Sequence, residues 1–109
     1  MQAQVLKNKI REYLDAQNFQ QKDQFTDNDF IPFLQFLMQI LMDLQGSNTN
    51  LSKKQLYAVL LDLSLDESEE EGVCYNLLLD TMDYVVGFHS AVAREGVLTE
   101  FIHLTQTMD

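Results

Sequence analysis

Apolar residues recur along the chain at helical spacing, and no sustained alternation of apolar and polar residues appears. Between residues 5 and 14 the apolar side chains fall on one stripe of a helix, with charged residues elsewhere on its surface. The stripe consists of Val5, Leu6, Ile10, Tyr13 and Leu14. The mostly polar stretch from 18 to 28 predicts a connection to the next helix.

A second helix is predicted from Asp29 to Gly46. Asp is a favourable N-cap, Pro32 is acceptable within the first turn, and glycine readily takes the left-handed conformation that ends helices. This helix is apolar on almost every side and therefore requires cover on nearly all of them. A second copy of the chain is one source of that cover, so the pattern leaves a homodimer open.

The strongest helix start is at Ser52. Ser52 and Gln55 have the spacing of a capping box, in which each side chain binds the backbone N–H of the other residue. Leu51 and Leu56 have the spacing of the hydrophobic staple that accompanies such a box. The pattern predicts a helix to about Ser64 whose apolar face carries Leu56, Val59, Leu60 and Leu63.

Residues 66–71 hold five carboxylates, which predict the first turn of a fourth helix because free N–H groups and the helix dipole favour negative charge there. We expect this helix to run to about Glu95 and to end at Gly96. A short last helix is predicted from Leu98 to about Thr107, with Leu98, Phe101, Ile102 and Thr105 on its apolar face. The predicted fold is all-α, a compact bundle of four to five helices in one domain, residues 1–109.

Composition agrees with a globular protein, because 46% of the 109 residues are hydrophobic and 22% are charged. The longest apolar stretch, residues 30–44, is shorter than the roughly 20 residues of a membrane span. We see no signal peptide, and the single cysteine, Cys74, fits a reducing compartment. The expected location is the cytoplasm, away from membranes.

Charge is distributed unevenly along the chain, whose net charge is −10. Residues 1–54 balance six basic against six acidic side chains, whereas residues 55–109 hold Arg94 against eleven acids. Such a balance argues against direct binding to nucleic acid or anionic membranes, and favours a basic protein partner. The predicted partner-binding residues are Asp62, Asp66, Glu67, Glu69, Glu70, Glu71, Asp80 and Asp83.

Residues suited to catalysis or metal binding are few. On one straight helix, Cys74 and His89 would stand about 22 Å apart, and His103 with either falls short of the four ligands of a structural zinc site. Glu100 and His103 match half of a di-iron motif that has no second copy. The glycines are isolated, so no phosphate-binding loop is present. We therefore expect no catalytic residue, metal or cofactor, and no enzyme activity.

Small size, acidity and the lack of motifs make the chain similar, at the level of functional class alone, to bacterial immunity proteins. That resemblance implies a toxin inhibitor that covers the positive cleft of a nuclease by protein–protein interaction. Two alternatives stay open. One is a DNA mimic that blocks a nuclease or DNA-binding protein, and the other is a secretion chaperone or assembly adaptor that grips a client through the apolar helix around residues 30–44.

Overall fold

Helices account for most of the residues that the computed structural model describes, which are 2–17, 19, 24–46, 51–66, 72–86 and 96–108. Among these residues there are five α-helices and no strand, so the predicted all-α class is confirmed. The helices are α1 (Gln2–Ala16), α2 (Asp27–Gly46), α3 (Lys53–Asp66), α4 (Val73–Val85) and α5 (Val97–Gln106).

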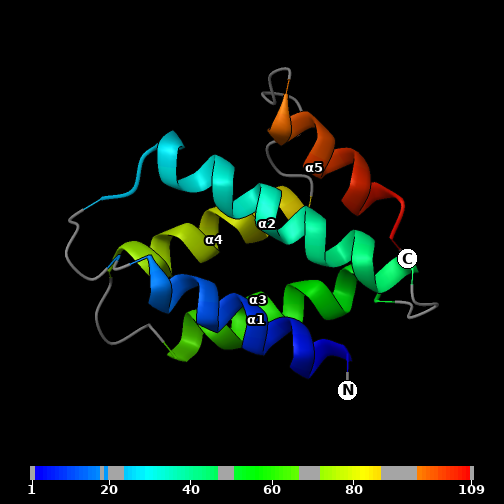
Figure 1. Ribbon diagram of the computed structural model, residues 1–109, viewed down its shortest axis with the longest axis horizontal. Coiled ribbons are helices and arrows are strands. Elements are labelled where there is room, and N and C mark those ends of the chain that lie inside the picture. The colour runs from blue at the N-terminus through cyan, green and yellow to red at the C-terminus, as the bar shows by residue number, and fades with distance from the viewer. Residues whose placement is uncertain are drawn as a thin grey trace.

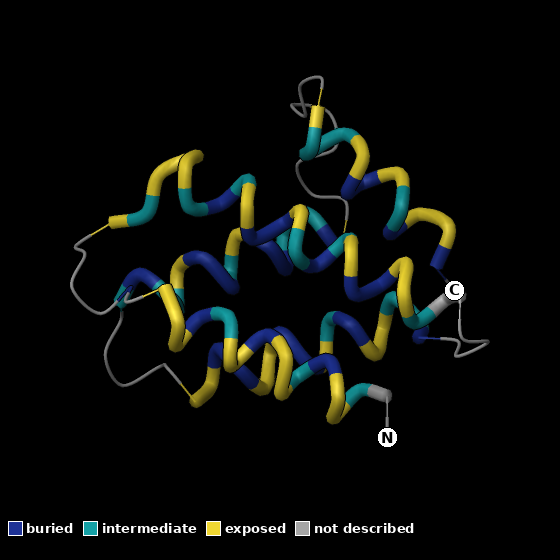
Figure 2. Tube along the Cα trace, viewed as in Figure 1, coloured by how far each residue is buried: buried dark blue, intermediate teal, exposed yellow. Residues whose placement is uncertain are grey.

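The helices form a flattened bundle of 37 × 33 × 19 Å (Figure 1), whose short dimension is close to two helix diameters. The helices α1 and α2 run antiparallel to each other, as do α3 and α4. The helix α1 packs on α3, which packs on α4, while α5 packs on α2. Buried residues line the inner sides of the helices and exposed residues line the outer sides (Figure 2).

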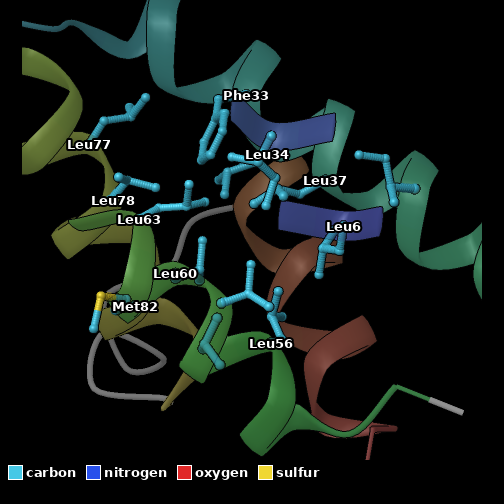
Figure 3. Packing of buried hydrophobic residues seen from close by; sticks show 14 of the residues in the cluster. Leu6, Phe33, Leu34, Leu37, Leu56, Leu60, Leu63, Leu77, Leu78 and Met82 are labelled. Atoms are coloured by element: carbon cyan, nitrogen blue, oxygen red, sulfur yellow. The ribbon is translucent and has the colours of Figure 1, made fainter. Parts of the chain in front are cut away.

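The core lies where the first four helices meet (Figure 3). Leu6 of α1, Phe33 of α2, Leu60 of α3 and Leu77 of α4 point into it, and each is completely buried. Burial of one such side chain stabilises the fold by about 1.5–3 kcal/mol. Phe101 of α5, also completely buried, belongs to the same core.

The predicted apolar stripe of α1 is correct except at one position. Leu6, Ile10 and Leu14 are buried and Tyr13 is half-buried, but Val5 is 45% exposed. The core therefore follows a narrow stripe with a spacing of four residues, and Val5 lies just outside it.

The helix α2 begins at Asp27, two residues before the predicted start, and its cap is Thr26 rather than Asp29. The Thr26 hydroxyl accepts a hydrogen bond from the Asn28 N–H at 3.2 Å, and the Asp29 carboxylate accepts one from the Thr26 N–H at 3.0 Å. This reciprocal arrangement is a capping box. Pro32 consequently lies in the second turn, where its missing N–H leaves the Asn28 carbonyl without the usual helical bond.

The predicted capping box of α3 is confirmed in both directions. The Gln55 N–H donates to the Ser52 hydroxyl at 3.1 Å, and the Ser52 N–H donates to the Gln55 side-chain oxygen at 2.9 Å. Leu51 and Leu56, the residues of the predicted staple, are both buried. Local sequence therefore determines where α3 begins.

Replacement of Ser52 by alanine is expected to lower the free energy of unfolding by about 1 kcal/mol, because the Gln55 N–H loses its acceptor. Urea denaturation measures the loss. The double variant with Ser52→Ala and Gln55→Ala should lose less stability than the sum of the two single variants, because the two reciprocal hydrogen bonds form one unit. Lys54→Ala, in the same exposed first turn, is the control. A Ser52→Ala loss no larger than that of this control would contradict the role of the box.

The fourth helix is shorter than predicted at both ends. It begins at Val73, with Gly72 as its N-cap, and Asp66 is the last residue of α3, so Asp66 does not belong to the first turn of α4. It ends at Val85, whereas the prediction extended it to Glu95. The remainder of the predicted extension, residues 87–95, lies outside the described residues, as do 67–71.

The last helix agrees with its prediction. Phe101, Ile102 and Thr105 are its buried residues, and Leu98 is half-buried. Gly96, predicted as a stop, is the N-cap of α5 and has a φ of 103°, a left-handed value that glycine tolerates far better than other residues.

The three buried polar residues of the described bundle bond within their own helices. Ser64 donates to the Leu61 carbonyl at 2.7 Å, Thr81 to Leu77 at 2.8 Å and Thr105 to Ile102 at 2.9 Å. Each hydroxyl therefore satisfies its hydrogen-bonding requirement without a partner on another helix. Among the described residues, no buried side-chain nitrogen or oxygen lacks a hydrogen-bond partner.

Candidate partner-binding surface

Basic and acidic side chains are segregated among the described helices. The described lysines and arginine lie on α1 and in the first turn of α3, and they are Lys7, Lys9, Arg11, Lys53 and Lys54. The sequences of α2, α4 and α5 contain carboxylates and no lysine or arginine. Three of the five helices therefore contribute only negative or neutral side chains to the surface.

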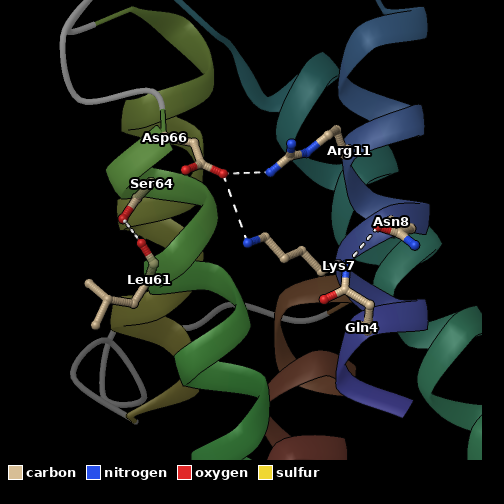
Figure 4. Close-up of polar contacts among 7 residues, drawn as sticks. All are labelled: Gln4, Lys7, Asn8, Arg11, Leu61, Ser64 and Asp66. Carbon is tan, nitrogen blue, oxygen red and sulfur yellow. Dashed lines mark hydrogen bonds and ion pairs between the residues drawn. The ribbon is translucent and has the colours of Figure 1, made fainter. Parts of the chain in front are cut away.

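Asp66 is paired within the molecule, which changes its predicted role. Arg11 Nη2 lies 2.5 Å from Asp66 Oδ2, and Lys7 Nζ lies 3.9 Å from the same oxygen (Figure 4). A carboxylate at the C-terminal end of α3 faces the negative end of the helix dipole, so these two cations offset an unfavourable position. Because the Asp66 side chain is half exposed, the pairing contributes at most about 1 kcal/mol. Asp66 links α3 to α1, and its charge is largely neutralised there.

The other predicted residues fall into two groups. Asp62 on α3 and Asp80 on α4 are exposed, and Asp83 on α4 is half-buried. The four predicted glutamates, Glu67, Glu69, Glu70 and Glu71, lie outside the described residues. The structure thus places Asp62, Asp80 and Asp83 on the two packed helices α3 and α4.

The charge pattern of the sequence does not single out Asp27, which the structure places near Tyr84, as it does Asp80. The negative charges of Asp27 and Asp80 both affect the phenol of Tyr84, which belongs to α4. The ring centroid of Tyr84 lies 5.6 Å from that of Phe30 on α2. The pKa of Tyr84 is raised first by burial, and then by the negative charges of Asp80 and Asp27. Tyr84 is neutral at physiological pH even with its ordinary pKa of about 10, and the shift shows that carboxylates from two helices lie near its phenol. The signal for Asp27 was the capping box around it, which places this side chain in the first turn of α2.

A second surface feature, the α1–α2 groove, is an open depression of about 480 Å³ between these helices. The rings of Tyr13 and Phe36 stack there, with centroids 4.4 Å apart and planes 20° apart. The pKa of Tyr13 is raised, chiefly by burial and secondly by the charge of Asp29. The groove is lined by Lys9, Glu12, Tyr13, Phe36, Gln39, Ile40 and Asp43.

Of Cys74, His89 and His103, the residues considered as soft metal ligands, the structure describes two. Within the described part of the chain, no group of three or more His, Cys, Asp or Glu side chains could hold a metal ion. Cys74 is half-buried on α4, and His103 is exposed on α5. His89 lies outside the described residues.

No protein-family model, curated protein or solved structure matches this chain. In the described ranges, no helix combines the length and the hydropathy needed to cross a bilayer.

Proposed function

We propose that this chain is a small acidic binding protein that inhibits a basic protein partner. In its finer form, the proposal is that the partner is a nuclease toxin and the chain is an immunity protein that covers the positive cleft. The observation that supports it most directly is the segregation of charge. The helices α2, α4 and α5 carry carboxylates and no lysine or arginine. On α1, Arg11 and Lys7 form ion pairs with Asp66.

The proposed contact surface contains Asp62, Asp80 and Asp83, with Asp27 added because it approaches the same tyrosine as Asp80. A nuclease needs lysine and arginine to bind phosphates, so its cleft is complementary to such a surface. Complementary charge accelerates association and selects the partner, even where it adds little affinity. We leave Asp66 out of the proposed contact surface, because its carboxylate forms an ion pair with Arg11 within the bundle.

The first step of the test is to identify the partner. The chain is used as bait in a native lysate, and bound proteins are eluted by raising the salt concentration, which weakens exposed charge pairs. The finer form of the proposal requires that a basic protein elutes and that its nuclease activity falls when the chain is added back. Release by competing DNA would instead favour the DNA mimic, and retention of an unfolded client through high salt would favour the chaperone.

Reversal of Asp62, Asp80 and Asp83 to lysine is expected to weaken binding of the eluted protein by roughly ten- to a hundred-fold at low salt. The association rate should fall and its salt dependence should flatten, because fewer favourable long-range charge pairs remain. The matched control reverses two exposed carboxylates that belong to neither the proposed contact surface nor the α1–α2 groove, Asp15 and Glu100, and it is compared with the double reversal of Asp62 and Asp80. Equal losses in these two double variants, measured by surface plasmon resonance, would show that net charge matters and that this surface does not.

A further inference from the structure

The α1–α2 groove combines an aromatic floor with a charged rim. Tyr13 and Phe36 form the floor with their stacked rings, and the buried Ile40 lies beside them. Phe33 supports Tyr13 from the core, with ring centroids 5.8 Å apart. The volume of about 480 Å³ is within the range of sites that hold small ligands or single side chains. The floor is suited to a flat group with a stem of methylenes.

The rim carries two carboxylates and one ammonium group. Glu12 projects from α1 and Asp43 from α2, and Lys9 is the one cation among the described residues that line the groove. The side-chain amide of Gln39 donates to Asp43 Oδ1 at 3.0 Å, which helps to orient that carboxylate at the rim. Neither Lys9 nor Glu12 forms an ion pair with another described residue. The rim is therefore net negative and complementary to a cation.

We propose that this groove receives an arginine side chain of the basic partner. The guanidinium plane lies over Tyr13 and Phe36, and its N–H groups donate to Glu12 and Asp43. Arginine fits better than lysine, because its planar group stacks on aromatic rings and its fixed fork of donors matches carboxylates. The inference depends on the proposed function for the source of the arginine, and it uses different residues from Asp62, Asp80 and Asp83.

The test uses the whole chain and a defined probe, the capped tripeptide acetyl-Ala-Arg-Ala-amide, in an NMR titration of the backbone amides at low salt. We expect saturable shifts at groove residues such as Glu12, Tyr13, Phe36 and Asp43. The lysine tripeptide should bind more weakly. The citrulline tripeptide, which keeps the shape and loses the charge, should produce no saturable shift at the groove. Shifts that grow without saturation, or equal binding of the citrulline peptide, would overturn the proposal.

Variants of the rim separate this site from general attraction to an acidic protein. Glu12→Gln should lower the affinity for the arginine peptide roughly two- to five-fold, because exposed charge pairs have effects of this size. Lys9→Gln should raise that affinity by a similar factor. Asp15→Asn is the matched control, because this exposed carboxylate is also on α1 but does not line the groove. The proposal fails if Asp15→Asn weakens binding as much as Glu12→Gln, or if Lys9→Gln weakens it.

Two other results keep the inference distinct from the proposed function. Concentration-dependent shifts at the groove without peptide would identify a second copy of the chain as its occupant and would overturn the arginine assignment. Peptide binding at the groove, in a protein whose Asp62, Asp80 and Asp83 reversal leaves partner affinity unchanged, would overturn the proposed contact surface and support the groove. If the peptide does not bind at the groove but the reversal of Asp62, Asp80 and Asp83 lowers partner affinity, the arginine site is overturned and the proposed contact surface is supported.

Discussion

Leu60→Ala is expected to lower the free energy of unfolding by about 2–5 kcal/mol. Leu60 is completely buried where α3 meets the core, so its truncation removes apolar burial and leaves a cavity (Figure 3). Domains of this size are stable by about 5–15 kcal/mol, and the melting temperature should fall by roughly 10 °C or more. Urea denaturation monitored by circular dichroism measures the change.

The neighbouring residue supplies a closely matched control. Leu61→Ala makes the same chemical change in the same helix, but Leu61 is 39% exposed and points away from α1 (Figure 4). Because the change in helix propensity is the same at both positions, the difference between the two variants isolates burial. We expect Leu61→Ala to cost less than about 1 kcal/mol. Similar losses for both variants would contradict the orientation of α3.

Phe101→Ala is expected to cost about 3–5 kcal/mol, since its ring is completely buried in the shared core. This prediction tests whether α5 is integral to the bundle, given that it packs chiefly on α2. His103→Ala, at an exposed position two residues later, should change stability by no more than about 0.5 kcal/mol. A loss below 1 kcal/mol for Phe101→Ala would mean that α5 adds little to the stability of the bundle.

Features encoded over a few residues were predicted well from the sequence. The capping box at Ser52 and Gln55 requires only two side chains and the backbone between them, so spacing alone was sufficient. The apolar faces of α3 and α5 were also correct, because helical periodicity determines which residues share a side. The box at Thr26 is similar, with Asp29 in the position that Gln55 holds in the Ser52 box, so Asp29 is the third residue of α2 and not its cap.

The length of α4 shows what periodicity does not determine. Apolar residues continue at helical spacing beyond Val85, so the pattern by itself predicted a longer helix. The helix ends where two β-branched valines are followed by Gly87, all residues of lower helix propensity than alanine or leucine. Periodicity therefore does not determine the residue at which α4 ends.

The candidate surface depended on contacts between residues far apart in the sequence. Asp66 meets Arg11 across 55 positions, so no local pattern could identify it as internally paired. Asp27 belongs to the half of the chain with balanced charge, and only the contact between Phe30 on α2 and Tyr84 on α4 brings it near the phenol that Asp80 also approaches. Segregation of charge along the sequence therefore indicated the kind of surface but not all of its members.

The bonding of Ser64, Thr81 and Thr105 within their own helices has a consequence for how the bundle is aligned. A hydroxyl bonded across two helices would be left unpaired if either helix slid or rotated, whereas these bonds move with the helix that contains them. Alignment of the interior is therefore enforced by the interlocking shapes of leucine and phenylalanine side chains rather than by these polar groups. Exchanges among hydrophobic residues of similar volume should be tolerated in such an interior, and uniqueness of packing should be lost before helical content.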